Sequence, residues 1–246
     1  MGISKSFGQA NTFEQLYNEV RQKENRILSI EQIKKLPETP PSFVHHAEWN
    51  LRKASTAGLL KRLDRWSQPA ILDLGCGNGW LMYKMAQKAG YVAGIDINLL
   101  ELEQAEEVLA AFDNTALFYG DIFEINLEKQ FDVILLNGSV QYFPQLQKLI
   151  DHLHKYLLPE GEIHIVDSPF YADKNAAQKA RDRSSAYYAG QGVADMVSYY
   201  HHHTFTDLKP YHYQALFDPQ HWWQKLKRKW SKVSPLFWIV IKSPLK

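Results

Sequence analysis

A glycine-rich turn after an apolar stretch is the strongest chemical signal in this chain. The segment Leu72-Asp-Leu-Gly-Cys-Gly-Asn-Gly79 runs from buried-type residues into three glycines at alternate positions. Glycine allows the backbone to turn sharply and lets a ligand approach where a Cβ would clash. A helix that follows such a turn presents unpaired N–H groups at its first residues. The segment therefore predicts a small-molecule binding loop, although a tight strand–helix turn without a ligand has the same composition.

Acidic residues recur where the first three strands are expected to end. Asp73 belongs to the first of these strands, Asp96 ends the second, about twenty residues after the glycines, and Asp121 follows the third. In an open parallel sheet, ligands bind outside the carboxyl ends of the strands, where an acidic side chain accepts hydrogen bonds from ribose hydroxyls. Each aspartate alone could be a helix cap. Together with the glycines, they predict a ribose-containing ligand.

The elements that position these residues alternate along the middle of the chain. Short apolar segments predict strands, and the segments between them predict helices over residues 80–88, 99–112 and 144–158. The predicted strands are residues 70–74, 91–95, 115–119, 131–136 and 162–166. Strands separated by helices indicate an α/β fold, a parallel sheet with helices on both faces.

Two flanking regions complete the predicted organisation. Residues 1–68 are predicted to be an N-terminal helical extension on the substrate side, with helices over about 12–28 and 44–66. Residues 69–246 form the main domain. An aromatic-rich insertion at about 168–210 interrupts its alternation, and strands at 211–217 and 236–241 flank a helix at 221–229.

Residues 69–167 resemble class I S-adenosylmethionine-dependent methyltransferases. The first motif of that family is an acidic residue two positions before a G-x-G-x-G turn, matched by Asp73, Gly75, Gly77 and Gly79. The resemblance implies a Rossmann-like doubly wound sheet of seven strands with the last one, at 236–241, antiparallel. It also implies S-adenosylmethionine as methyl donor and S-adenosylhomocysteine as product. An NAD(P)-dependent oxidoreductase is the rival in this fold, but its glycines are usually spaced G-x-G-x-x-G.

The resemblance also implies roles for individual residues. The loop Gly75–Gly79, with Cys76 and Asn78, would pass under the methionine part of the donor, and Asp73 would lie near its ammonium group. Asp96 would bind the ribose hydroxyls and Asp121 would face the adenine amino group. The remaining donor contacts would be Ile97 and Ile122 against the adenine ring and Asn137, Gly138 and Ser139 beside the methionine portion.

The methyl acceptor is predicted only by class. The Asn/Asp-Pro-Pro-Tyr/Phe signature of enzymes that methylate amide or exocyclic amino nitrogens is missing, and Asn137-Gly-Ser-Val-Gln-Tyr142 stands in its place. We expect a small organic acceptor, with Tyr142, Tyr171 and His203 as candidate contacts in an aromatic site. We assign no catalytic residue, because alignment with an activated methyl donor supplies most of the catalysis.

Composition and charge weigh against several other functions. With 28 basic and 27 acidic residues the net charge is +1, so a nucleic-acid partner is not expected. The three adjacent histidines, 201–203, do not predict a metal site, because neighbouring residues on a strand point to opposite faces. No apolar run reaches the roughly 18 residues of a membrane span. The single cysteine, Cys76, allows no intrachain disulfide and fits a reducing, cytoplasmic setting.

Three interpretations stay open at this point. The chain could bind the donor without catalysis, as a scaffold or sensor, or methylate RNA through the basic cluster at 225–232, although a solvated helix face is the favoured interpretation of that cluster. Arg52 could reach the carboxylate of the donor, but we expect it to be solvated.

Overall fold

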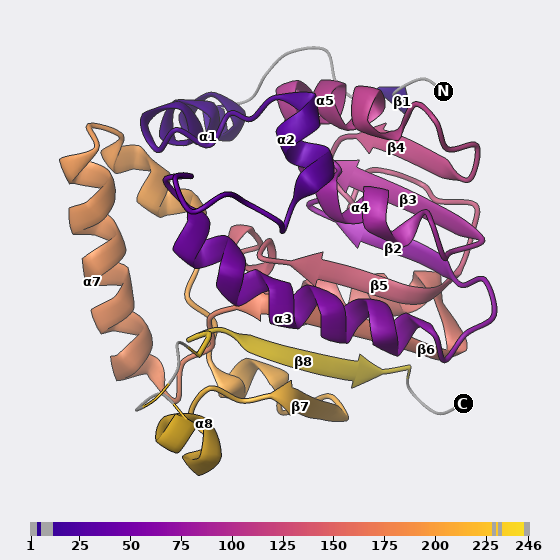
Figure 1. Ribbon diagram of the computed structural model, residues 1–246. Helices are drawn as coiled ribbons and strands as arrows, with labels where there is room; N and C mark the ends of the chain where they lie inside the picture. Colours follow the sequence, from indigo (N-terminus) through magenta and orange to yellow (C-terminus); the bar gives the residue numbers. More distant parts are fainter. Residues whose placement is uncertain (1–3, 6–11, 228–229, 231–232, 244–246) are drawn as a thin grey trace.

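A single sheet organises the computed structural model, which describes residues 4–5, 12–227, 230 and 233–243. The strand order is β1-β4-β3-β2-β5-β6-β8-β7 (Figure 1). The strands are β1 Ser4–Lys5, β2 Ala70–Leu74, β3 Tyr91–Asp96, β4 Thr115–Tyr119, β5 Phe131–Asn137, β6 Leu157–Ser168, β7 Tyr213–Phe217 and β8 Phe237–Lys242. Neighbours are parallel except that β8 is antiparallel to both β6 and β7. The predicted seven-stranded Rossmann-like sheet with an antiparallel last strand is confirmed, and β1 adds a two-residue edge strand.

The chain reverses its direction of travel across the sheet between β2 and β5. It runs outward from β2 through β3 to β4 and then returns to pair β5 with the other edge of β2, where Leu72 lies opposite Ile134. The central strands are apolar on both sides because helices cover both faces. At such a reversal, neighbouring crossovers lie on opposite faces and leave a crevice at the carboxyl ends of the strands.

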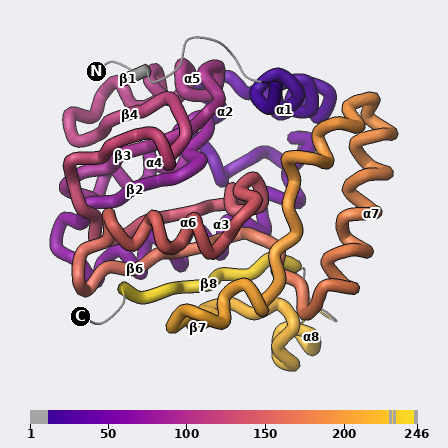
Figure 2. The backbone as a smooth tube through the Cα atoms, turned by 180° about the vertical axis from the view of Figure 1, so that it is seen from behind, coloured from indigo at the N-terminus to yellow at the C-terminus, as the bar shows by residue number. Residues whose placement is uncertain are grey.

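Helices pack against the two faces of the sheet in separate cores. One face carries α2 Ile30–Lys35, α3 His46–Leu63, α4 Trp80–Met85 and α5 Leu99–Leu109, whose fully buried side chains include Leu59, Met82 and Leu102. The other carries α6 Leu146–Leu153, with Leu149 and Leu153 in its core (Figure 2). Because α3 shares a core with the sheet, part of the N-terminal extension is a layer of the main domain.

A third cluster lies beyond the carboxyl ends of the strands. It joins α1 Thr12–Lys23 to α7 Lys174–Gly190 and to the short helix η3 Ala194–Tyr199, and we call these three elements the aromatic lobe. Val20, Tyr188 and Met196 are buried in it. Figure 1 shows α1 and α7 together on one side of the sheet, past the strand ends.

Helix α7 lies inside the segment for which the sequence predicted no regular element. Asp173 caps it, accepting a hydrogen bond from the Ala176 N–H at 2.8 Å. Only Ala180 and Tyr188 of its seventeen residues are buried, so no continuous apolar stripe revealed the helix. The last helix, α8 Trp222–Lys227, follows β7. In the described part of the chain, no helix has the length and apolar character that crossing a membrane requires.

Candidate functional site

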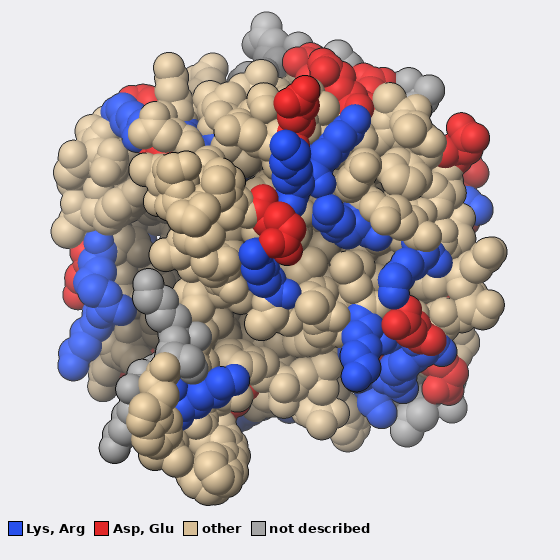
Figure 3. Space-filling model, in the orientation of Figure 1, with Lys and Arg blue, Asp and Glu red and all other residues tan. Residues whose placement is uncertain are grey.

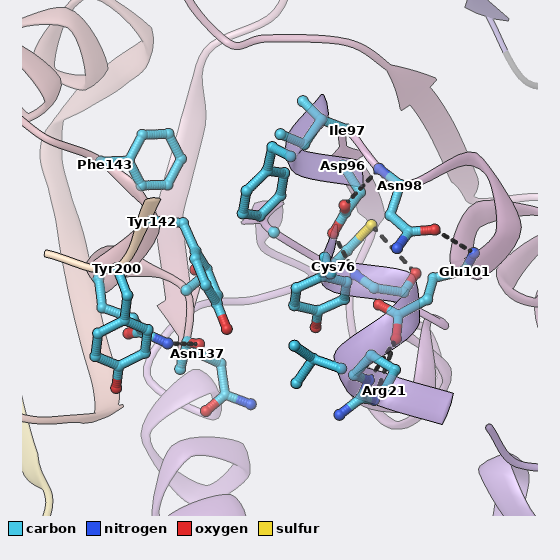
Figure 4. A pocket seen from close by; sticks show the side chains of 18 of the residues that line it. Arg21, Cys76, Asp96, Ile97, Asn98, Glu101, Asn137, Tyr142, Phe143 and Tyr200 are labelled. Carbon is cyan, nitrogen blue, oxygen red and sulfur yellow. Dashed lines mark hydrogen bonds and ion pairs between the residues drawn. The ribbon is translucent and has the colours of Figure 1, made fainter. Parts of the chain in front are cut away.

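One cavity of about 860 Å³ lies between the carboxyl ends of the strands and the aromatic lobe. Figure 4 shows Asp96, Ile97 and Asn98 on one side of it, and Tyr142, Phe143 and Tyr200 on the other. The structure brings most of the predicted site residues to the wall of this main cavity. They are Gly75, Cys76, Gly77, Asn78, Asp96, Ile97, Asp121, Ile122, Asn137, Gly138, Ser139, Tyr142 and Tyr171.

The glycine turn forms the floor of the main cavity and depends on its glycines. Gly75, Gly77 and Gly79 have φ angles of 76°, 51° and 75°, in the left-handed region. A Cβ on Gly75 would lie 2.5 Å from the Ser139 Cβ, and one on Gly79 would lie 2.9 Å from the Ala105 Cβ. Gly79 is not on the cavity wall, so its role is close packing of α4 against α5.

Asp96 ends β3 with both carboxylate oxygens held by the backbone. Its Oδ2 accepts a hydrogen bond from the Gly77 N–H at 2.8 Å, and its Oδ1 accepts one from the Asn98 N–H at 2.9 Å (Figure 4). Burial, with the charge of nearby Glu101, raises the pKa of Asp96 to about 7. The strand end and the glycine turn therefore fix the orientation of this carboxyl group.

Asp73 lies beneath the turn and not on the cavity wall. Its side chain is only 2% exposed, and burial followed by the charge of Asp96 raises its pKa to about 7. A buried carboxyl group without a counter-ion is unfavourable, so its place next to a binding loop needs a functional reason.

Several buried polar atoms at this site have no hydrogen-bond partner among the described residues. They are Asp73 Oδ1, Asn137 Oδ1, Gln141 Oε1 and Arg52 Nε. Nearly all buried polar atoms in proteins are paired, so these atoms are expected to meet a polar ligand or ordered water. Asn137, Gln141 and Arg52 line the main cavity, which offers such a ligand both acceptors and a cationic donor.

The expectation that Arg52 is solvated is wrong. Helix α3 turns this side chain toward the cavity, where its Nη2 lies 3.2 Å from Glu48 Oε1 and its guanidinium carbon 5.3 Å from the centre of the Trp49 ring. Because α3 also packs on a face of the sheet, less of its circumference faces solvent than in an isolated helix, and Arg52 lies on the covered part.

Helix α1 supplies a second group of polar residues, which the sequence did not single out. Glu14 Oε1 accepts a hydrogen bond from the Leu99 N–H at 2.7 Å, and Arg21 Nε donates to Glu101 Oε1 at 3.1 Å. Between them, Asn18 Oδ1 accepts one from Asn98 Nδ2 at 2.7 Å. Their spacing of four and three residues places them on one helix face. That spacing was readable, but nothing in the sequence indicated the partners on α5.

Tyrosine rings form the opposite wall of the main cavity. The Tyr142 ring lies 5.5 Å from the Phe13 ring and 5.6 Å from the Tyr17 ring, both on α1, and 5.8 Å from the Tyr200 ring. Burial raises the pKa of Tyr142 to about 12 and that of Tyr171 above its usual value. These phenols are therefore neutral at physiological pH and act as hydrogen-bond donors instead of bases.

The structure does not bring His203 to the main cavity. It is buried, its Nε2 lies 3.1 Å from the Val140 carbonyl oxygen, and it lines a neighbouring groove. That nitrogen carries the proton, because a carbonyl oxygen only accepts hydrogen bonds. Within the described residues, no group of three or more His, Cys, Asp or Glu side chains is arranged to hold a metal ion.

A family model described as a methyltransferase domain matches residues 67–232, two thirds of the chain, including strands β2 to β7. The chain belongs to this methyltransferase domain family. The matched region contains the glycine turn, Asp96 and α7, and it begins after α3, so α1 to α3 are outside it.

Among curated proteins, the methyltransferase domain is similar to enzymes with several different acceptors. A malonyl-[acyl-carrier protein] O-methyltransferase from Priestia megaterium is 33% identical over 96 residues, which are 38% of this chain and 35% of that protein. An arsenite methyltransferase from Aquipseudomonas alcaligenes is 29% identical over 154 residues, which are 56% of this chain and 44% of that protein. The chain thus spans less than half the length of either relative.

Solved structures extend the likeness of the fold to nearly the whole methyltransferase chain. The protein YcgJ from Bacillus subtilis has a TM-score of 0.61 at 12% identity, covering 78% of this chain and 99% of its own. Magnesium protoporphyrin IX methyltransferase from Synechocystis PCC 6803 has a TM-score of 0.54 at 14% identity and covers 92% of both chains. At these identities the similarity concerns the fold alone.

Proposed function

We propose that this protein transfers a methyl group from S-adenosylmethionine to a small organic acceptor. The observation that carries the proposal is the continuity of the main cavity, which joins the glycine turn and Asp96 at one end to the tyrosine wall at the other. Methyl transfer needs donor and acceptor side by side in one enclosed space. Membership of the methyltransferase domain family supports this interpretation.

The donor would occupy the end built from the strand ends. Its ribose hydroxyls would face Asp96, its adenine would lie between Ile97 and Ile122 near Asp121, and its ammonium group would lie above the turn over Asp73. Arg52, whose Nε is buried and unpaired, is positioned to meet a carboxylate. The bound donor supplies an already activated methyl group. The chain's own task is therefore to orient both partners and exclude water.

The acceptor would occupy the tyrosine end, which suits a flat or partly apolar molecule with a few polar atoms. Tyr142 belongs to the tyrosine wall and, being neutral, would donate a hydrogen bond to the acceptor instead of removing a proton.

Cys76, buried in the turn, is the chain's one cysteine, and we place the enzyme in a reducing, cytoplasmic setting on that ground.

Calorimetry with S-adenosylmethionine, S-adenosylhomocysteine and NAD tests the donor assignment. We expect the first two ligands to bind and Asp96→Ala to weaken both by about tenfold or more, the worth of a charged hydrogen bond. Asp113→Ala is the matched control, an acidic residue outside the lining of the main cavity. Binding of NAD alone would overturn the proposal. If the donor binds but no product forms across an acceptor panel, the scaffold interpretation replaces catalysis.

A further inference from the structure

A second groove of about 1020 Å³ lies beside the main cavity on the rear of the molecule. In Figure 2, α6 and α7 stand on either side of the orange segment that carries residues 201–204, and these parts form the walls and floor of the groove. The groove and the main cavity share Phe123, Pro144, Gln145 and Lys148 in their linings. The two spaces therefore meet at a rim formed by these four residues.

Four basic side chains line this groove without an acidic partner. Lys148, Lys155, Lys174 and Arg181 form no ion pair with any described residue, and Lys148 lies over the Phe123 ring at 4.9 Å. We call this set, with the lining around it, the basic groove. Since like charges repel, four unpaired cations around one depression are unfavourable unless an anion joins them.

The basic groove also contains two acidic residues, which are held by neutral partners and offset only two of its four positive charges. Asp207 Oδ2 accepts hydrogen bonds from the Thr204 N–H at 2.7 Å and the Thr204 hydroxyl at 3.0 Å. Asp151 Oδ1 accepts one from the Tyr211 hydroxyl at 2.8 Å. The opposite face of the molecule contrasts with this arrangement, because in Figure 3 most Lys and Arg side chains lie beside Asp or Glu. One such pair is Arg62 of α3 with Glu162 of β6, whose Nη2 and Oε1 atoms lie 2.8 Å apart.

The imidazoles on the floor do not add positive charge. Burial lowers the pKa of the three histidines, and Arg181 lowers it further for His201 and His202, so that the pKa of His202 is about 4. His202 Nε2 pairs with the Ser184 hydroxyl at 3.0 Å, while its Nδ1 is buried without a partner among the described residues. The lysines and the arginine therefore set the sign of the field, and the floor offers neutral polar groups.

Helix α7 forms a wall of both spaces, with residues of its N-terminal half along the basic groove and residues of its C-terminal half along the main cavity. Lys174, Gln178 and Arg181, spaced four and three residues apart, line the basic groove, whereas Ser184 and Tyr188 line the main cavity. A single molecule could follow the helix from the groove across the rim and reach the tyrosine wall.

We propose that the basic groove binds the anionic tail of the acceptor, a phosphate or polycarboxylate group, while the reactive end of the same molecule lies in the main cavity. This inference rests on the proposed function, since it names a property of its acceptor. Four cations and neutral donors around one depression match the several oxygens of such a group. The net charge of only +1 favours a small anion over a nucleic acid as the ligand of this groove.

Binding of inorganic pyrophosphate to the full chain tests the proposal, with citrate as a polycarboxylate probe in parallel. We expect at least one probe to bind, and Lys174→Gln/Arg181→Gln to weaken that binding by about tenfold. Stronger pyrophosphate binding would indicate a phosphate tail, and stronger citrate binding a polycarboxylate. Lys61→Gln/Lys179→Gln removes the same charge from exposed positions outside both linings and should change the dissociation constant by less than about twofold.

Several results would overturn the inference. The first is that neither pyrophosphate nor citrate binds, and the second is that both double variants weaken probe binding equally. The third is that a single-stranded RNA oligomer binds, that Lys174→Gln/Arg181→Gln abolishes this binding, and that pyrophosphate does not displace the RNA. Titrating the same samples with S-adenosylmethionine separates the two proposals. If the probes fail but all variants still bind S-adenosylmethionine, only the inference about the groove is overturned and the proposed function stands. If the unaltered chain does not bind S-adenosylmethionine, the proposed function itself is contradicted.

Discussion

The two carboxyl groups under the glycine turn are held close together at a cost to stability. Burial deprives both Asp73 and Asp96 of water. A nearby negative charge adds to this effect, that of Asp96 for Asp73 and that of Glu101 for Asp96, and the pKa of each rises to about 7. A cationic ligand group above them would reverse this effect. Residues that destabilise a fold but favour a ligand are typical of binding sites.

Asp73→Asn should therefore stabilise the protein without ligand and weaken the donor. The folded-state pKa of Asp73 is raised, so the folded chain keeps a proton that the unfolded chain has lost between about pH 4 and 7. Stability of the unaltered protein falls across that window and then levels off. We expect the variant to unfold about 3 °C higher at pH 8, with the gain vanishing near pH 4, and to bind S-adenosylmethionine about tenfold more weakly. Thermal unfolding between pH 4 and 8 measures the first effect, and a gain independent of pH would contradict it.

Gly75→Ala should damage the turn itself. The alanine would adopt a φ near 76° and place its Cβ 2.5 Å from that of Ser139, which is held by a hydrogen bond from its hydroxyl to the Leu74 carbonyl at 2.6 Å. We expect a loss of about 2 kcal/mol in the free energy of unfolding in urea, and weaker donor binding. Gly190→Ala is the control, since a Cβ there meets no atom within 4 Å. Similar losses in both variants would contradict this account of Gly75.

At the scale of elements, α1 connects the two ends of the main cavity. Its polar face, with Glu14 and Arg21, holds the start of α5 beside the strand ends. Its apolar face, with Phe13, Tyr17 and Val20, packs in the aromatic lobe. The recurrence of apolar residues at 13, 16, 17 and 20 predicted the helix, whereas its position over the cavity depends on contacts about 80 residues distant in the sequence, which no local pattern contains.

The contact of α3 with β6 depends on a buried carboxylate. Burial would raise the pKa of Glu162, but hydrogen bonds from His164 and from Arg62, whose Nε lies at 2.9 Å, lower it to about 2. Its stabilising contribution is therefore complete above about pH 4.5 and lost as the pH falls toward 2. Glu162→Gln should cost about 2 kcal/mol in urea unfolding at pH 7 and much less at pH 3. The exposed Glu160→Gln should cost little at either pH, and an equal loss for Glu162→Gln at both would contradict the argument.

At the scale of the whole molecule, the sequence pattern predicted the parallel strands and the residues at their ends, whereas the antiparallel last strand was implied by the family resemblance. The first parallel strands carry local signals, namely apolar runs followed by glycine or aspartate. The sequence did not predict α7, which buries too few residues to show a period, or the cavity-facing position of Arg52, which follows from how α3 packs. The predicted contact His203 lies in the basic groove, because the segment after η3 runs behind the main cavity. Such placements follow from packing between distant segments.

Binding of the donor should slow amide hydrogen exchange in specific segments of the chain. Peptides covering 75–78 and 96–98 should exchange more slowly with S-adenosylmethionine bound, because these residues line the donor end of the main cavity. Helix α1 should be protected as well, since Glu14, Asn18 and Arg21 attach it to the start of α5. Strand β7 and helix α8 line neither the main cavity nor the basic groove and should be unchanged. Protection of the turn without protection of α1 would show that α1 is not coupled to the donor end, and protection everywhere would indicate general stabilisation of the fold.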